Sequence, residues 1–111
     1  MSDQDPPAGS SQLVSFERAD VVSLMIYPAP PPKLVVTGQV PYMNIEVTLN
    51  PVRYIQRPEY WVIEVVGQMP VIGLPALAPY AVELDLTGLI GTRGIEVVGA
   101  NQTERIDIPS A

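Results

Sequence analysis

Histidine and cysteine are both absent from this 111-residue sequence, and lysine occurs once, as Lys33. Histidine is the usual general base near neutral pH and the commonest ligand of transition metals. Cysteine supplies disulfides, thiolate nucleophiles and thiolate metal sites. Without histidine, the usual serine hydrolase mechanism has no base. We therefore expect no enzyme activity, no cofactor and no metal site.

Positive charge and long apolar runs are also scarce. Six Lys and Arg residues stand against twelve Asp and Glu residues, so the formal net charge is −6. Phosphate backbones and anionic lipid surfaces repel such a chain, so we expect no nucleic-acid partner. No run of about 18 apolar residues is present, so we expect no membrane insertion. No basic segment followed by an apolar run opens the sequence, so we expect no signal peptide within it.

What is present is a series of short stretches in which apolar and polar residues alternate, each closed by Pro or Gly. A period of two places every second side chain on one face, as in a half-buried strand. No stretch has the helical period of 3.6 residues. We predict an all-β protein, an immunoglobulin- or fibronectin-type-III-like sandwich of about seven strands, at residues 21–27, 34–40, 45–49, 60–66, 81–86, 95–98 and 103–108.

The composition divides the chain into a tail and one domain. Residues 1–12 contain acids, prolines, Gly and Ser but no large apolar residue after Met1, so we expect a disordered tail or linker. Residues 13–111 form the single predicted sandwich, with 13–16 as a short lead-in strand. Residues 67–80 contain three prolines and two glycines, which predicts an irregular crossover.

Two segments resemble small bacterial immunoglobulin-like domains. DVVSLMIYPAPPPKLVVTGQVP (20–41) resembles their first two strands, and YAVELDLTGLIGTRGIEVVG (80–99) resembles a later strand pair. The resemblance covers roughly residues 20–108 and implies a β-sandwich without assigned activity, placed in the cell envelope or outside the cytoplasm. Two features depart from it, because Ile95 stands where those domains commonly carry Tyr and no disulfide is possible.

One segment concentrates the residues that anchor protein interfaces. Residues 53–61 hold Arg53, Tyr54, Arg57, Tyr60 and the single tryptophan, Trp61. Arg and aromatic side chains provide large contact areas at low entropic cost, which favours a recognition surface. The same residues also suit a structural role, with Trp61 between the sheets and Arg and Tyr paired across strands. The sequence leaves both interpretations open.

Two further regions are more apolar than expected for their positions. The predicted strand 60–66 is apolar on both faces: Trp61, Ile63 and Val65 face one way, and Tyr60, Val62 and Val66 the other. Val98 adds an outward apolar residue on another strand, so the lead-in 13–16, the crossover 67–80, a partner or a second subunit could cover this face. The crossover 67–80 either plugs an open end of the sandwich, which we favour, or forms a binding patch.

These patterns favour a non-enzymatic protein-binding or accessory module whose partner the sequence leaves unidentified. The alternative is a structural or assembly subunit that self-associates through its apolar sheet face. The strand carboxylates support neither catalysis nor calcium binding, because they fall on the polar phase of the alternation and belong to no Ca²⁺-loop motif. They are Glu46, Glu64, Glu83, Asp85, Glu96 and Asp107.

Overall fold

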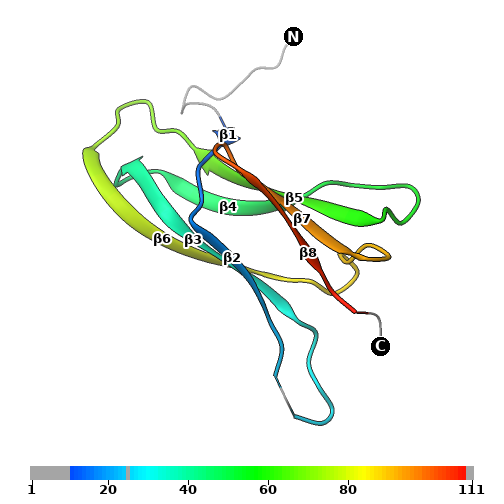
Figure 1. Cartoon of the computed structure of the whole chain (residues 1–111). Coiled ribbons are helices and arrows are strands. Elements are labelled where there is room, and N and C mark those ends of the chain that lie inside the picture. The colour runs from blue at the N-terminus through cyan, green and yellow to red at the C-terminus, as the bar shows by residue number, and fades with distance from the viewer. Residues whose placement is uncertain (1–10, 25, 110–111) are drawn as a thin grey trace.

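The computed structural model describes residues 11–24 and 26–109. These residues form eight strands in two sheets and no helix, so the predicted all-β class is confirmed (Figure 1). In this part of the chain, no helix is long and apolar enough to cross a bilayer. The strands are β1 (Ser11–Leu13), β2 (Arg18–Val22), β3 (Lys33–Tyr42), β4 (Glu46–Pro51), β5 (Tyr60–Gln68), β6 (Pro75–Asp85), β7 (Gly94–Val98) and β8 (Thr103–Asp107).

The smaller sheet has the order β2-β3-β6, and both of its strand pairs are antiparallel. β3 pairs with β6 from Lys33 opposite Asp85 to Tyr42 opposite Pro75, with an irregularity between Val40 and Tyr42. This long pairing gives the smaller sheet its length, and the two strands run side by side in Figure 1.

The larger sheet is built around β5. β4 pairs along one edge of β5. β1 and β7 share the other edge: β7 pairs with residues 60–64 of β5, and β1 pairs with residues 66–68 of β5. β8 pairs with β7 on the outside. The β5–β7 pair is parallel, whereas the immunoglobulin sandwich consists of antiparallel sheets. This pair therefore differs from the arrangement that the sequence resemblance implies.

The chain passes from the larger sheet to the smaller one through residues 14–17. The Val14 amide donates a hydrogen bond to the carbonyl of Val65 in β5 (3.0 Å), and the Glu17 amide donates to the carbonyl of Thr37 in β3 (2.8 Å). Phe16 lies between these two contacts and is completely buried. Its aromatic ring thus fills the core where the first strand changes sheets.

The core lies between the two sheets and follows the alternation of the strands. β3, β5 and β7 each contribute side chains at every second position, and the loops add a few more. Among the described residues no polar or charged residue is buried, so the core is wholly apolar. Its members are Val14, Phe16, Ala19, Leu34, Val36, Val40, Ile45, Ile63, Val65, Leu86, Ile95 and Val97.

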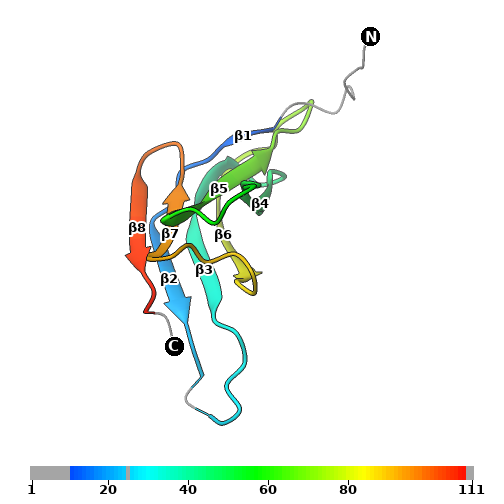
Figure 2. The ribbon, with the colours of Figure 1, turned by 90° about the vertical axis from the view of Figure 1, so that its right-hand side faces the viewer.

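The strand predicted at 21–27 is displaced in the structure. β2 ends at Val22, and its inward residues are Ala19, which is buried, and Val21, which is half-buried. Val22, Leu24 and Ile26, which share one face of the strand predicted at 21–27, are 47%, 55% and 60% exposed. Val21 and Val22 are consecutive, so either of them can be the inward residue of an alternating pattern. Ala19 is too small to indicate in the sequence that the strand begins before residue 21. The chain instead continues into a hairpin that projects from the body of the molecule (Figures 1 and 2).

The crossover predicted at 67–80 is much shorter than expected. β5 extends to Gln68 and β6 begins at Pro75, so only residues 69–74 connect them. β6 tolerates Pro75 and Pro79 because it is an edge strand, where a missing backbone donor costs less than in the middle of a sheet. Reading every proline as a strand breaker was therefore wrong for this segment.

Other boundaries moved by a few residues. Ser11 and Gln12, expected in the tail 1–12, belong to β1, and residues 1–10 lie outside the described residues. The lead-in strand predicted at 13–16 is found at Ser11–Leu13 instead. β4 includes Pro51 as its last residue, and 52–55 does not continue the strand, although the Val52 amide still donates to the carbonyl of Val62 (2.9 Å).

Candidate interaction surfaces

The Arg–aromatic segment 53–61 forms a loop and the start of β5, and much of it is bonded internally. The indole Nε1 of Trp61 donates a hydrogen bond to the carbonyl of Val52 (2.8 Å), and the Tyr54 ring packs edge-on against Trp61 with centroids 5.2 Å apart. Trp61 is half-buried against the edge of the core, not enclosed between the sheets as the structural interpretation required. Tyr54 Oη also accepts a long hydrogen bond of 3.4 Å from the Val62 amide.

Arg57 connects this loop to the one before β7. Its Nε donates to the carbonyl of Ile90 (2.9 Å), and its Nη2 donates to the carbonyl of Gly91 (3.1 Å). The Thr92 amide returns a hydrogen bond to the carbonyl of Pro58 (2.9 Å). The Arg57 guanidinium thus holds the loop before β5 against the loop before β7. Arg53, by contrast, is exposed beside a shallow groove that Tyr54 and Trp61 also line.

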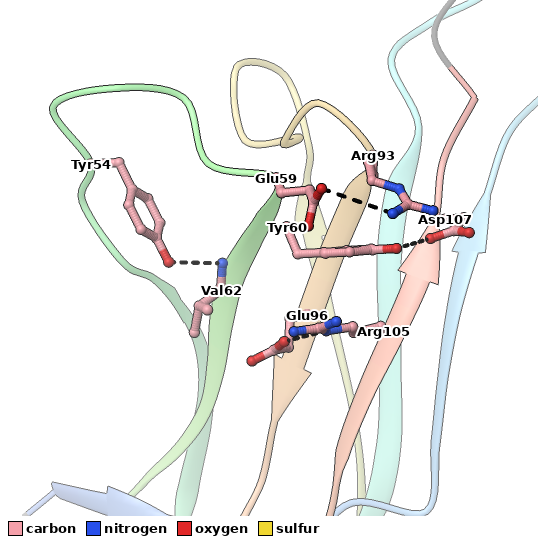
Figure 3. Close-up of polar contacts among 8 residues, drawn as sticks. All are labelled: Tyr54, Glu59, Tyr60, Val62, Arg93, Glu96, Arg105 and Asp107. Carbon is pink, nitrogen blue, oxygen red and sulfur yellow. Dashed lines mark hydrogen bonds and ion pairs between the residues drawn. The ribbon is translucent and has the colours of Figure 1, made fainter.

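Tyr60 faces the outside of the larger sheet and joins a polar network there. Its hydroxyl donates a 2.6 Å hydrogen bond to Asp107 Oδ1 in β8, and its ring lies between the guanidinium groups of Arg93 and Arg105 (Figure 3). The two guanidinium carbons are 5.7 and 4.7 Å from the ring centroid, within the range of cation–π attraction. The pKa of Tyr60 is raised, mainly because ionisation would remove the hydrogen bond to Asp107.

Two carboxylates complete the network. Arg93 Nη1 lies 3.8 Å from Glu59 Oε2 in an ion pair, and Arg105 Nε donates a 2.8 Å hydrogen bond to Glu96 Oε1. The residue types of 53–61 point to Tyr60 but not to its partners, which come from β7, β8 and the loops before β5 and β7. The positions of these partners depend on the parallel pairing of β5 and β7, which places Tyr60 opposite Gly94. Because Gly94 has no side chain, the two arginine side chains can lie against the Tyr60 ring.

The apolar residues predicted for the outer sheet face do lie on neighbouring strands. β5 and β7 pair directly, and Val98 stands opposite Glu64, between Val62 and Val66 in register. All four of these side chains are half-buried. A carboxylate therefore interrupts the predicted apolar face at its centre, and the face is mixed instead of continuous.

A second apolar surface lies at the opposite end of the molecule from the Arg–aromatic loop, where the β3–β4 turn meets the β5–β6 connection (Figure 1). Its large apolar side chains are between 39% and 77% exposed. In the segment 67–80, Met69 packs against the core, but Val71, Ile72, Leu74 and Leu77 do not plug the end of the sandwich as favoured. We call this surface the apolar end patch. It consists of Tyr42, Met43, Val71, Ile72, Leu74 and Leu77.

The backbone beneath the apolar end patch is held in place. The Asn44 side chain donates through Nδ2 to the carbonyl of Ile72 and accepts through Oδ1 from the Leu74 amide, both at 3.0 Å. The Met43 amide donates to the Leu74 carbonyl (3.0 Å). Gly73 lies against the Tyr42 ring so closely that a Cβ there would approach the ring at 2.6 Å. The loop's polar groups are thus paired inward while its apolar side chains point outward.

The described residues contain no group of three or more acidic side chains that could hold a metal ion, and their carboxylates are exposed or half-buried. Comparison with known proteins adds no assignment, because the chain matches no protein-family model, no curated protein and no solved structure. The surfaces themselves are therefore the basis for a functional proposal.

Proposed function

We propose that the protein is a non-enzymatic binding module that docks the apolar surface of a protein partner with its apolar end patch. The observation that carries this proposal is the exposure of six large apolar side chains on two adjacent segments, with Ile72 77% and Leu77 72% exposed. Contiguous apolar exposure of this kind on a folded domain is typical of interaction sites.

The fixed backbone of the patch supports the same proposal. A loop that orders only on binding loses conformational entropy at that moment, which weakens the complex. Here Asn44 and the Met43 amide already fix the loop at both sides of Gly73. The apolar side chains are therefore presented in a preformed arrangement.

The surrounding charges favour a protein partner over a second copy or a membrane. Residues 40–48 and 67–80 contain one charged residue, Glu46, and no Lys or Arg. Surfaces that insert into lipid headgroups carry basic residues around their apolar side chains, and this one does not. Two copies, each with a net charge of −6, would repel one another, so an uncharged or basic partner fits better.

The test compares wild type with an Ile72→Asp/Leu77→Asp variant and with Ile55→Asp as the matched control. Ile55 is fully exposed in the loop at the opposite end of the molecule. Partners retained by immobilised wild type are purified, and each binary complex is measured by calorimetry. We expect the patch variant to bind at least about tenfold more weakly, as for interface anchors generally, and the control to bind normally.

Three results would overturn this proposal. The first is equal affinity of the partner for wild type and the patch variant. The second is patch-dependent binding to neutral phosphatidylcholine vesicles, which would indicate a lipid surface. The third is a wild-type dimer in sedimentation velocity that the patch variant lacks, which would make a second copy the occupant. Unchanged urea unfolding in both variants shows that the substitutions leave the fold intact.

Self-association through the outer face of the larger sheet is the second candidate. It is supported by the direct pairing of β5 and β7, which gathers Val62, Val66 and Val98. Glu64 lies among them, and bringing two copies together would bury that carboxylate unless a basic residue met it. We rank this surface second for that reason. A dimer in sedimentation velocity that Val62→Glu dissociates would place it first.

An immunoglobulin-like relationship is part of the proposal at the level of architecture. The β2-β3-β6 order and the β7–β8 pair match the strand order of one half of that sandwich and the last pair of the other. The parallel β5–β7 pair speaks against a close relationship.

A further inference from the structure

One side of the sandwich is open between β2, the outer strand of the smaller sheet, and β8, the outer strand of the larger sheet (Figures 1 and 2). A hollow of about 420 Å³ lies between the two strands. Half-buried Val21 of β2 and half-buried Ile106 of β8 give it an apolar lining, together with buried Ala19. An extended chain segment that entered this hollow would reach the edges of both strands.

The edge of β8 has a row of backbone groups that no described strand pairs, because β8 pairs with β7 alone. At one end of this pair the Gly99 amide donates to the Gln102 carbonyl (2.9 Å). At the other end the Ile108 amide donates to the Arg93 carbonyl (2.8 Å). In an antiparallel pair, every second residue directs its backbone groups to the partner strand. The residues of β8 that direct theirs away from β7 are Thr103, Arg105 and Asp107.

The edges of β2, β4 and β6 are less suited to an added strand. β4 and β6 both contain proline, which has no amide hydrogen to donate. At the start of β2 the Glu17 amide donates to the carbonyl of Thr37, although the register partner of Thr37 is Arg18. Two residues thus face one there, an irregularity that blunts a strand edge. β8 has neither a proline nor a register shift over Thr103–Asp107.

Glu104 determines which kind of segment fits this edge. It lies on the inward phase of β8, two residues from Ile106, and its half-buried side chain lines the hollow. It forms no ion pair with any described residue. Asp20 and Asp107 line the same hollow, whereas none of its described lining residues is basic. A neutral strand added here would dehydrate the Glu104 carboxylate without pairing it, whereas a lysine or arginine side chain would pair with it.

We propose that the edge of β8 accepts an extended, basic segment of a protein partner as an added strand. Main-chain hydrogen bonds align a segment of this kind, and its alternate side chains provide specificity. The side chains that enter the hollow are a basic one beside Glu104 and an apolar one beside Ile106. The net charge of −6 attracts such a segment and disfavours a second copy. This surface is independent of the apolar end patch, and either proposal can fail without the other.

The test titrates isotope-labelled protein with the synthetic peptide Lys-Thr-Val-Thr-Lys-Thr-Val-Thr-Lys, followed by nuclear magnetic resonance. In the extended peptide, lysine and valine alternate on one face and threonine covers the other. We expect chemical-shift changes at β8 and around the hollow, and slower solvent exchange of the Thr103, Arg105 and Asp107 amides. The same peptide with glutamate in place of lysine should bind at least about tenfold more weakly.

Two pairs of variants separate charge from backbone pairing. Glu104→Gln should weaken binding about tenfold, whereas Glu46→Gln, the same charge change on exposed β4, should change it by no more than about twofold. Arg105→Pro removes an amide hydrogen that points away from β7 and should also weaken binding about tenfold. Arg105→Ala removes the same side chain but keeps the amide, and should bind as well as wild type. Unchanged resonances of the core in each variant establish that the fold persists.

Two N-methylated peptides take the place of Arg105→Pro if that variant loses its core resonances. One is methylated at the threonine amides and the other at the lysine and valine amides. Because alternate amides of a strand point to opposite edges, only one of the two peptides should still bind.

Four results would overturn the proposal. The first is the absence of shift changes at β8, and the second is equal binding of the lysine and glutamate peptides, of Arg105→Pro and Arg105→Ala, or of the two methylated peptides. The third is slower exchange at Ala19 and Val21 in place of β8, which would locate the added strand on β2. The fourth is a dimer in sedimentation velocity that Arg105→Pro dissociates, which would make a second copy the occupant.

Discussion

The side-chain amide of Asn101 pairs with both backbone groups of Phe16, eighty-five positions earlier in the chain. Asn101 Oδ1 accepts from the Phe16 amide at 3.1 Å, and Asn101 Nδ2 donates to the Phe16 carbonyl at 3.0 Å. The neighbouring Gln102 donates to the same carbonyl at 2.8 Å. The β7–β8 hairpin therefore takes the place of a strand partner where the chain crosses between the sheets.

Replacing Asn101 with Ala should destabilise the protein by about 1–3 kcal/mol, because the partly buried Phe16 amide loses its acceptor while the Phe16 carbonyl keeps only the bond from Gln102. Gln102→Ala removes one bond and should cost about 0.5–1.5 kcal/mol. Urea unfolding of both variants measures the difference. Equal stability of Asn101→Ala and wild type would show that water replaces the amide without loss.

Trp61 should contribute to stability as a half-buried residue. Trp61→Phe removes the bond from the indole N–H to Val52 and should cost about 0.5–1.5 kcal/mol. Trp61→Ala should cost about 2–4 kcal/mol, at the lower end for a large aromatic because part of the indole is already in contact with water. A cost above 5 kcal/mol in urea melts would mean that the indole is enclosed by the core.

Gly94 is required because β7 and β8 approach each other closely there. A Cβ at this position would overlap the carbonyl oxygen of Ile106 and lie 2.9 Å from the Cα of Asp107, and backbone atoms cannot easily move aside. We expect Gly94→Ala to cost about 1–3 kcal/mol or more. The control is Gly88→Asn, which has open space and a φ of +72° that Asn tolerates, and which should change stability little. Thermal unfolding that ranked the two variants in the opposite order would contradict this assignment.

Tyr80 should make the protein less stable at high pH. Its hydroxyl donates a 2.6 Å hydrogen bond to the carbonyl of Ser15, and burial, with a smaller effect of Glu17, raises its pKa to about 12. The unfolded chain releases this proton near pH 10, so its stabilising effect is complete below pH 10 and is lost as the pH rises towards 12. In urea melts from pH 9 to 12, Tyr80→Phe should show a shallower decline than wild type. If wild type and Tyr80→Phe lose the same stability between pH 9 and 12, groups other than Tyr80 cause the loss.

Much of the fold follows from alternation alone. The buried apolar side chains of β3, β5 and β7 are spaced two or four residues apart, as a one-sided strand requires, and most of these strands lie where the pattern placed them. The failures have local causes. Val21-Val22 fits both phases of the alternation, and the prolines of β6 are acceptable only because that strand lies at an edge, which depends on the tertiary arrangement.

The surfaces were harder to predict than the strands. Tyr60 was singled out for its residue type, but its contacts with Arg93, Arg105 and Asp107 depend on strands that pair across more than thirty positions. The 67–80 segment was recognised as unusually apolar, but whether Ile72 and Leu77 are covered is decided by the rest of the fold. Residue type can be read locally, whereas exposure cannot.

The prolines of β6 have a consequence for how this protein behaves at high concentration. Among the described strands, β6 has one hydrogen-bonded neighbour, β3; exposed Leu74 directly precedes β6, and exposed Leu77 lies near its start. An open, apolar strand edge is a common starting point for aggregation by strand addition. Pro75 and Pro79 have no N–H to offer an incoming strand, so the edge is a poor template. The apolar side chains beside it can thus remain exposed with little risk that copies of the chain grow into fibrils from this edge.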